Sequence, residues 1–224
     1  FFFFFFAAKV AIDPESTTLQ RSEAWIQLSG TGSVRWRQQW VPYSDISDNL
    51  KRAVIASEDD SFINHDGVDW NAIEKAWERN AKAEAQAAKA QTRTPDRPVR
   101  TPKVRGGSTI TQQLAKNLLL SGERTLLRKG QEFVLTLLLE QLLSKPRILE
   151  IYLNNVEWGE GVFGAEAAAQ HYFKKSAARL SASEAARLAV MLPAPKRFEK
   201  APGSSYLAGR TRTILGRMGG AALP

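Results

Sequence analysis

The sequence contains no cysteine and only two histidines, His65 and His171. The absence of cysteine excludes disulfide bonds and thiolate metal sites, so neither can hold the fold together. Two histidines disfavour a zinc site built on imidazole, whereas hard cations bound by carboxylates stay open. With 224 residues the chain is nevertheless long enough to bury a full hydrophobic core.

A long hydrophobic run is also missing. Residues 1–8 are wholly apolar, but a helix needs about 20 apolar residues to cross a bilayer. The sequence begins with phenylalanine rather than methionine, which indicates the cut end of something longer, although an artificial end is an alternative. We therefore expect residues 1–12 to be the end of a truncated N-terminal membrane anchor, and residues 13–224 to form the functional domain.

Positive charge is in excess. The formal net charge is +8, and residues 79–105 hold eight basic residues against two acidic ones, a local net charge of +6. Such a cluster is typical of a segment that meets nucleic acid, a phospholipid surface or a pyrophosphate, and equally of a solvated linker. Pro95, Pro98 and Pro102 lie in the same segment. We expect residues 79–105 to form a mobile basic loop.

The hydrophobic periodicity predicts a mainly α fold in one domain. Residues 13–43 are the least helical part, and Val34, Trp36 and Trp40 alternate with polar neighbours, which predicts an extended strand. Beyond that segment apolar residues recur at helical spacing. Helices are predicted to begin at Ser47, Asp69 and Ser108 and to span 124–143, 147–155, 165–172, 185–192 and 206–218.

The first candidate site is a carboxylate pair, Glu58 and Asp59, which directly follows a largely apolar run. If the preceding helix continues, Glu58, Phe62 and His65 fall at i, i+4 and i+7 and share one face. An apolar wall raises the pKa of a carboxylate towards the range that a general base needs. The alternative is a polar helix end with solvated charges.

A second candidate is the glycine-rich turn at 105–108, which opens a helix and leaves backbone N–H groups free to bind an anion. Ser108 is the expected N-cap. Thr109, Gln113 and Lys116 follow on one face of that helix. Three hydrogen-bonding side chains in a row are unsuited to a hydrophobic core, so we expect them to line a ligand-binding site.

Helix 124–143 is strongly apolar, and it is predicted to be a buried helix rather than a membrane span because charges interrupt it. Arg128 and Glu132 form an i, i+4 pair on it. We expect these charges to face a cleft, and we expect Glu58 and Glu132 to face the same one.

Four segments in this order resemble the successive motifs of the peptidoglycan glycosyltransferase family, the polymerases that string lipid II into glycan strands. They are EDDSFINHDG at 58–67, GGSTITQQLAKN at 106–117, RKGQE at 128–132 and ILEIYLN at 148–154. A fifth segment, 180–193, resembles the last motif of the family. The match covers roughly residues 41–195, and five motifs in the right order are hard to obtain by chance.

The resemblance implies a mainly α fold with a single lysozyme-like catalytic lobe and a smaller membrane-associated lobe. It implies that Glu58 is the base that takes the proton from the 4-hydroxyl of the acceptor sugar, and that Glu132 is the second catalytic carboxylate, acting with Arg128 on the donor diphosphate. The implied substrate-binding residues are Asp59, Phe62, His65, Thr109, Gln113, Lys116, Asn117 and Arg128. Fixed positive charge from Lys116 and Arg128 suits a diphosphate leaving group, and a single base on the opposite face gives inversion.

The resemblance also implies a setting. Lipid II and the growing glycan strand are the implied partners, at the membrane surface on the periplasmic side of a bacterial cytoplasmic (inner) membrane, with a single N-terminal anchor. No organic cofactor is implied, and nucleic acid is not expected as a partner. Two points stay open: a divalent cation such as Mg or Mn held by Glu132, and partners among other cell-wall synthesis or division proteins.

Two features depart from the family pattern. Bifunctional relatives carry a lysine after the last apolar helix, where this chain has Pro193, and residues 79–105 form a longer segment than the family leads us to expect. No Ser-x-x-Lys and no Lys-Thr-Gly motif occurs, so we expect no transpeptidase activity.

Two other functions compete with this interpretation. A lysozyme-like enzyme that cleaves the same polymer would also use one glutamate, but would have little use for Lys116 and Arg128. A nucleic-acid-binding module would explain the basic charge, but that charge lies in a proline-rich segment and not on a recognition helix.

Overall fold

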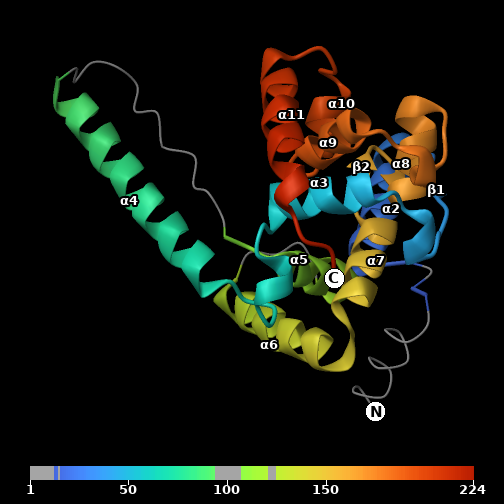
Figure 1. The fold of residues 1–224 in the computed structure, drawn as a ribbon, viewed down its shortest axis with the longest axis horizontal. Helices are drawn as coiled ribbons and strands as arrows, with labels where there is room; N and C mark the ends of the chain where they lie inside the picture. The colour runs from blue at the N-terminus through green and yellow to red at the C-terminus, as the bar shows by residue number, and fades with distance from the viewer. Residues whose placement is uncertain (1–12, 15, 94–106, 121–124) are drawn as a thin grey trace.

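The computed structural model describes residues 13–14, 16–93, 107–120 and 125–224, and the described chain is mainly α, as predicted (Figure 1). The helices are α2 Thr18–Thr31, α3 Asp48–Glu58, α4 Trp70–Arg93, α5 Ile110–Leu119, α6 Leu126–Leu142, α7 Lys145–Asn155, α8 Ala165–Phe173, α9 Ala182–Met191, α10 Pro195–Glu199 and α11 Ser205–Arg217. Three short strands, β1 Arg37–Gln38, β2 Glu157–Gly159 and β3 Val162–Phe163, form a sheet of order β1-β3-β2. β3 pairs parallel with β1 and antiparallel with β2.

Helix α3 lies at the centre of the larger group of helices and packs against α9 and α11 (Figure 1). Ser47 caps α3 as predicted, because its side chain accepts a hydrogen bond from Leu50 N. The residues that follow are buried almost continuously from Ala53 to Ala56. The core therefore fixes the position of Glu58, the last residue of the helix.

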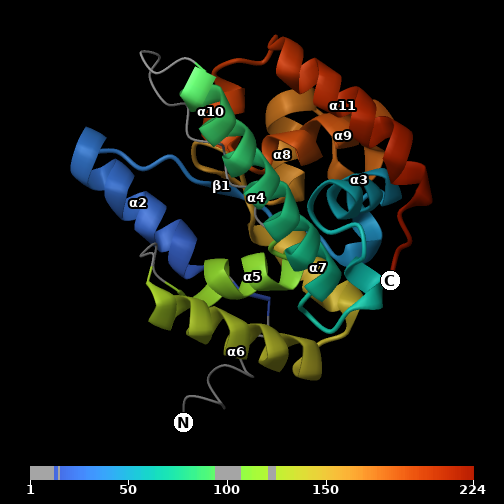
Figure 2. The same ribbon diagram turned by 90° about the vertical axis from the view of Figure 1, so that its left-hand side faces the viewer.

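Helix α5 packs against α2, α6 and α7, and both ribbon views place it above α6 (Figures 1 and 2). Its buried apolar residues are Ile110, Leu114, Ala115 and Leu118. The start of α5 reaches the end of α3, since Ile110 N donates to the carboxylate of Asp59. Two segments that are about 50 residues apart in the sequence thus meet at one place.

The prediction that residues 13–43 are the least helical part is wrong for the first half, because α2 occupies fourteen residues there. The strand predicted around Val34, Trp36 and Trp40 is present as the short strand β1. A reciprocal capping box starts α2, in which Thr17 and Gln20 satisfy each other's backbone N–H groups. Gln20 Nε2 also donates to the backbone oxygen of Asn155 in α7, so tertiary docking adds to the local signal.

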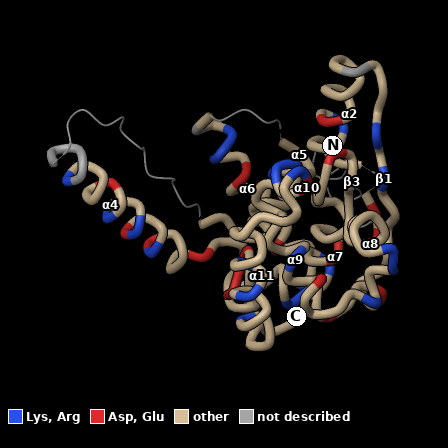
Figure 3. The backbone as a smooth tube through the Cα atoms, turned by 90° about the horizontal axis from the view of Figure 1, so that it is seen from above, with Lys and Arg blue, Asp and Glu red and all other residues tan. Residues whose placement is uncertain are grey.

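The predicted mobile loop at 79–105 is wrong for its first part, because α4 continues through residue 93. The stretch is rich in alanine and other strong helix formers, and these outweigh the lack of an apolar core face. Figure 3 shows basic and acidic residues interspersed along α4. The rest of the predicted loop, residues 94–105, lies outside the described residues, and so does the expected anchor remnant at 1–12.

Helix α6 was predicted to be buried, but it is buried on one face only. Leu135, Thr136 and Leu139 face the protein, whereas Leu127 and Val134 are 76 % and 55 % exposed. None of the helices within the described ranges is long and apolar enough to cross a bilayer.

Candidate active site

Glu58 stands at the C-terminal end of α3 on the wall of a groove of about 990 Å³. Ser57 Oγ and Gln113 Nε2 donate hydrogen bonds to its two carboxylate oxygens, both at 3.2 Å. Burial raises the pKa of the Glu58 carboxyl above its ordinary value, while these two hydrogen bonds and the charge of Arg210 oppose the rise. A half-buried carboxylate with a raised pKa that still borders an open groove is suited to accept a proton.

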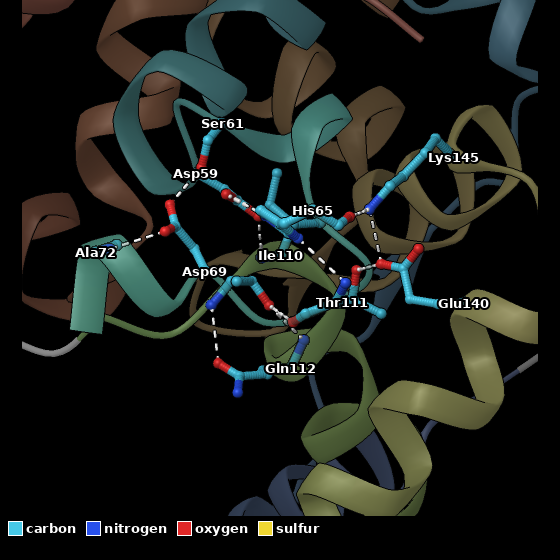
Figure 4. Close-up of polar contacts among 12 residues, drawn as sticks. Asp59, Ser61, His65, Asp69, Ala72, Ile110, Thr111, Gln112, Glu140 and Lys145 are labelled. Atoms are coloured by element: carbon cyan, nitrogen blue, oxygen red, sulfur yellow. Dashed lines mark hydrogen bonds and ion pairs between the residues drawn. The ribbon is translucent and has the colours of Figure 1, made fainter. Parts of the chain in front are cut away.

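Asp59 is buried and holds the two halves of the site together (Figure 4). Its Oδ1 lies 2.8 Å from His65 Nε2, and its Oδ2 accepts from Ile110 N at 2.9 Å. His65 Nδ1 accepts from Gly67 N, so the ring proton of the neutral imidazole is on Nε2 and points at Asp59. Asp59 therefore anchors α5 and His65, with both oxygens already engaged.

The condition for a shared helical face of Glu58, Phe62 and His65 is not met, because α3 ends at Glu58. The chain then turns through a 3-10 helix, Phe62–Asn64. Phe62 is fully buried in the core, whereas His65 lines the groove. The break places Asp59 and His65 over the start of α5, which a continuous helix would not do.

Thr109, and not Ser108, is the N-cap of α5. Its side chain accepts from Gln112 N and donates to Gly67 O at 2.6 Å, so it closes the helix end and ties it to the first motif. Gln113, one turn into α5, reaches Glu58. Thr109 lines the groove with Glu58, and Gln113 lines a second hollow.

This second hollow has a volume of about 450 Å³, and Ser108 lines both it and the groove. Its charged residues are Glu23, Lys116, Arg128, Lys129 and Glu132, and Asn117 also lines it. Glu132 is buried, with Arg128 Nη1 3.1 Å from its Oε2 and Lys129 Nζ against its Oε1. The predicted i, i+4 pair is thus confirmed, and Lys129 is a third member.

The residues around Glu132 do not fit a resident divalent cation. Both carboxylate oxygens of Glu132 are paired with basic side chains. Within the described ranges there is no group of three or more His, Cys, Asp or Glu side chains that could hold a metal ion. The divalent cation considered from the sequence stays a prediction.

The structure distributes the ten candidate residues over three places. Four line the groove: Glu58, Asp59, His65 and Thr109. Five line the second hollow: Gln113, Lys116, Asn117, Arg128 and Glu132. Phe62 is in the core beneath them. Glu58 and Glu132 therefore line two hollows that adjoin at Ser108.

Sequence reasoning missed a cluster of polar residues beneath the groove. Lys145 Nζ donates to His65 O and to Glu140, and Glu140 in turn accepts from Thr111 Oγ1 at 2.6 Å (Figure 4). Tyr152, buried in α7, donates to Gln113 Oε1. Glu140 interrupts an apolar helix, and this interruption could have indicated a polar site. Its network includes residues from three other segments, so the contacts could not be predicted from local spacing.

Comparison with known proteins assigns the chain to a family. The profile of the family described as Transglycosylase matches residues 27–219. Proteins named biosynthetic peptidoglycan transglycosylase are similar over most of the chain: 51 % identity in Paraburkholderia xenovorans (98 % of this chain, 86 % of the relative), and 52 % in both Herminiimonas arsenicoxydans (95 % and 84 %) and Bordetella pertussis (92 % and 80 %). The chain therefore belongs to the transglycosylase family, whose members are glycosyltransferases.

Proposed function

We propose that the protein polymerises the glycan strands of peptidoglycan. In this proposal it transfers the growing glycan, held on a lipid diphosphate, to the 4-hydroxyl of lipid II with inversion. The proposal includes no transpeptidase step, since no Ser-x-x-Lys and no Lys-Thr-Gly motif occurs in the given sequence. The names of the relatives support peptidoglycan as the polymer.

The observation that carries the proposal is that the two adjoining hollows differ in their charged residues. The groove is lined by five carboxylates, Glu58, Asp59, Asp60, Asp66 and Asp69, and of these Glu58 stands at the end of α3 with a raised pKa and hydrogen bonds from Ser57 and Gln113. The second hollow presents Lys116, Arg128 and Lys129 against Glu23 and Glu132. A base on one side and clustered positive charge on the other is the arrangement that transfer from a diphosphate donor requires.

On the acceptor side, Glu58 removes the proton of the attacking 4-hydroxyl as the new glycosidic bond forms. His65 and Thr109 line the same groove, and Asp59 fixes the position of His65. Attack from the side opposite the departing diphosphate inverts the anomeric centre. One carboxylate suffices on this face, because the leaving group departs as a stable anion and needs no second carboxylic acid.

On the donor side, the positive charges stabilise the diphosphate as it leaves. Arg128 Nε is buried and has no hydrogen-bond partner among the described residues, so it can donate to a phosphate oxygen. Glu132 holds Arg128 in place through the pair at 3.1 Å. In a cleaving enzyme, which has no diphosphate to bind, this cluster of charges would lack a purpose.

The surface around the groove suits a substrate with a lipid tail. Trp70, Phe133 and Leu137 line the groove together with Glu58, and all three are exposed. They continue into the exposed face of α6 at Leu127 and Val134. We propose that this strip rests on the outer face of the bacterial inner membrane, with an N-terminal anchor in that membrane, and that other cell-wall synthesis proteins are partners.

The test is polymerisation of purified lipid II by the variant Glu58→Gln. Glutamine keeps the shape of the side chain but cannot accept the proton, so the rate should fall by at least about 10²–10⁴-fold, the usual contribution of a general base. Glu160→Gln, at an exposed carboxylate outside the groove, is the matched control and should leave the rate unchanged. The assay with and without a chelator also tests the metal.

Binding of a lipid diphosphate to Glu58→Gln should stay near that of the unaltered protein, because the second hollow is intact. A Glu58→Gln protein that still makes glycan strands at the original rate would end this mechanism. Cleavage of finished glycan, with no polymerisation of lipid II, would favour the competing hydrolase.

A further inference from the structure

A line of hydrogen bonds connects Glu58 to a buried tyrosine. Tyr152 lies in α7 and is 1 % exposed. Its hydroxyl donates to Gln113 Oε1 at 2.9 Å, and Gln113 Nε2 donates to Glu58 Oε2 at 3.2 Å. Three helices, α7, α5 and α3, thus contribute one residue each to a chain that ends on the candidate base.

The chemistry of the three groups fixes the direction of this chain. An ionised carboxylate only accepts hydrogen bonds, so the amide nitrogen of Gln113 must face Glu58 and its oxygen must face Tyr152. Burial, together with the negative charges of Glu58 and Asp59, raises the pKa of Tyr152 well above its ordinary value. The phenol therefore stays protonated and keeps a hydrogen to donate.

A Glu58 protonated on Oε1 would leave Oε2 as a neutral carbonyl oxygen, which accepts the N–H of Gln113 more weakly than a carboxylate does. A Glu58 protonated on Oε2 would call for the opposite arrangement, in which its O–H is the donor, the amide of Gln113 turns its oxygen towards Glu58, and the amide nitrogen meets Tyr152. The hydroxyl hydrogen of Tyr152 would lose its acceptor in a fully buried place, which is costly. Tyr152 thus disfavours the flipped amide, and with it the protonated form of the base.

We propose that Tyr152 is a positioning residue that, through Gln113, holds Glu58 in its ionised, proton-accepting form. This inference rests on the proposed function of Glu58 and adds a residue that acts without touching the substrate. Other groups also act on Glu58: Ser57 and Asp59 beside it, and Arg210 from α11. The further titratable and charged residues that line the groove are Asp60, His65, Asp66, Asp69, Lys75, Arg79 and Arg217.

The test replaces the hydroxyl alone, in Tyr152→Phe. Without it the amide of Gln113 can turn either way, so the pKa of Glu58 should rise. The acid limb of the pH–rate profile should then move to higher pH. On that limb kcat should fall by about three- to tenfold, the effect of one hydrogen bond, while KM for lipid II changes little. The pKa of Glu58 can be read independently by NMR titration of carboxyl-labelled glutamate.

Tyr172→Phe is the matched control. Tyr172 is a partly buried tyrosine whose hydroxyl donates to Trp158 O at 2.7 Å, away from the groove. Its loss should lower the melting temperature comparably to Tyr152→Phe but leave the pH–rate profile and the Glu58 titration in place. The double variant Tyr152→Phe/Gln113→Ala should behave like Gln113→Ala alone, because the tyrosine acts through the glutamine.

The outcomes separate the two proposals. If Tyr152→Phe leaves the Glu58 titration and the acid limb where they are, Tyr152 is only structural and this inference is overturned. If the titration moves as expected while Glu58→Gln remains fully active, Tyr152 does tune Glu58, but the proposed function of Glu58 as the base fails.

Discussion

At the scale of single residues, the carboxylates of this protein differ in what surrounds them. Asp59 has both oxygens engaged by His65 and Ile110, so it can build the site but has no free side for a proton from a substrate. Glu58 instead accepts from the hydroxyl of Ser57 and the side-chain amide of Gln113, both at a longer 3.2 Å, and borders the groove. Two adjacent acids thus take two roles because the helix ends between them.

Glu157 is a carboxylate outside the groove whose ionisation should affect stability. Burial raises its pKa to about 7, the negative charge of Glu23 adds to the rise, and Lys196, 3.5 Å away, opposes it. At pH values between the ordinary pKa of a glutamate and about 7, Glu157 keeps its proton in the folded protein and releases it in the unfolded chain. The stability that Glu157 contributes is therefore present at low pH and is lost as the pH rises through about 7.

We expect Glu157→Gln to be more stable relative to the unaltered protein at pH 8 than at pH 5, because glutamine removes the cost of ionising a buried acid. Thermal melts of both proteins at the two pH values measure this difference, and other titrating groups cancel in the comparison. A difference in melting temperature that is the same at both pH values would contradict it.

Gly67 and Gly130 provide a second prediction, with opposite signs. Gly67 has φ +89°, and a Cβ there would lie 2.6 Å from Thr136 Cγ2, so Gly67→Ala should destabilise the fold by about 1–3 kcal/mol. Gly130 is in the interior of α6, where a Cβ would meet nothing within 4 Å beyond the backbone of its own helix, so Gly130→Ala should stabilise by about 0.5–1 kcal/mol. Denaturant unfolding of the two variants measures both changes in the free energy of unfolding. Equal changes would contradict the prediction, because they would mean that the surroundings of the added Cβ have no effect.

At the scale of elements, helices with local capping signals were predictable. Ser47 before α3 and the Ser181–Glu184 box before α9 both behave as the sequence indicates. Helix α2 is not among the predicted helices although Thr17 and Gln20 carry the same kind of signal, because the alternation of Val34, Trp36 and Trp40 with polar residues favours an extended chain after it. The end of α3 could not be predicted, since it depends on Asp59 reaching α5 across the fold.

The candidate site was predictable as a set of residues but not as a geometry. Motif resemblance picked out residues that gather around two hollows, with Phe62 as the exception in the core. It gave no means of finding Tyr152 or Lys145, whose roles depend on contacts between helices that are far apart in the sequence. Side chains that touch the groove carry recognisable chemistry, whereas those that support it look like ordinary members of helices.

At the scale of the whole molecule, one group of exposed apolar residues lies beside the groove on α4 and α6, and another lies on α2 at Trp25, Ile26 and Leu28. Trp70 and Trp77 protrude from α4, and the rings of Trp70 and Phe133 are 6.4 Å apart, which joins α4 to the exposed face of α6. In Figure 1, α4 projects from the body and α6 lies at the bottom, away from α11. A contiguous exposed apolar surface rimmed by charge marks an interaction site, and tryptophan is enriched at the membrane interface.

If this surface rests on a membrane, Val134→Glu should weaken binding of the protein to vesicles of phosphatidylethanolamine and phosphatidylglycerol. The substitution removes an apolar side chain that would lie in the bilayer and puts a charge in its place. The partition coefficient of the protein between water and the vesicles should therefore fall by about tenfold or more. Leu215→Glu, on the exposed face of α11, is the control and should bind as the unaltered protein does. Residues 1–12 are common to both variants, so a difference in sedimentation with vesicles belongs to the substituted position. Equal binding by the two variants would mean that α6 does not face the bilayer, and the exposed strip would then need a protein partner instead.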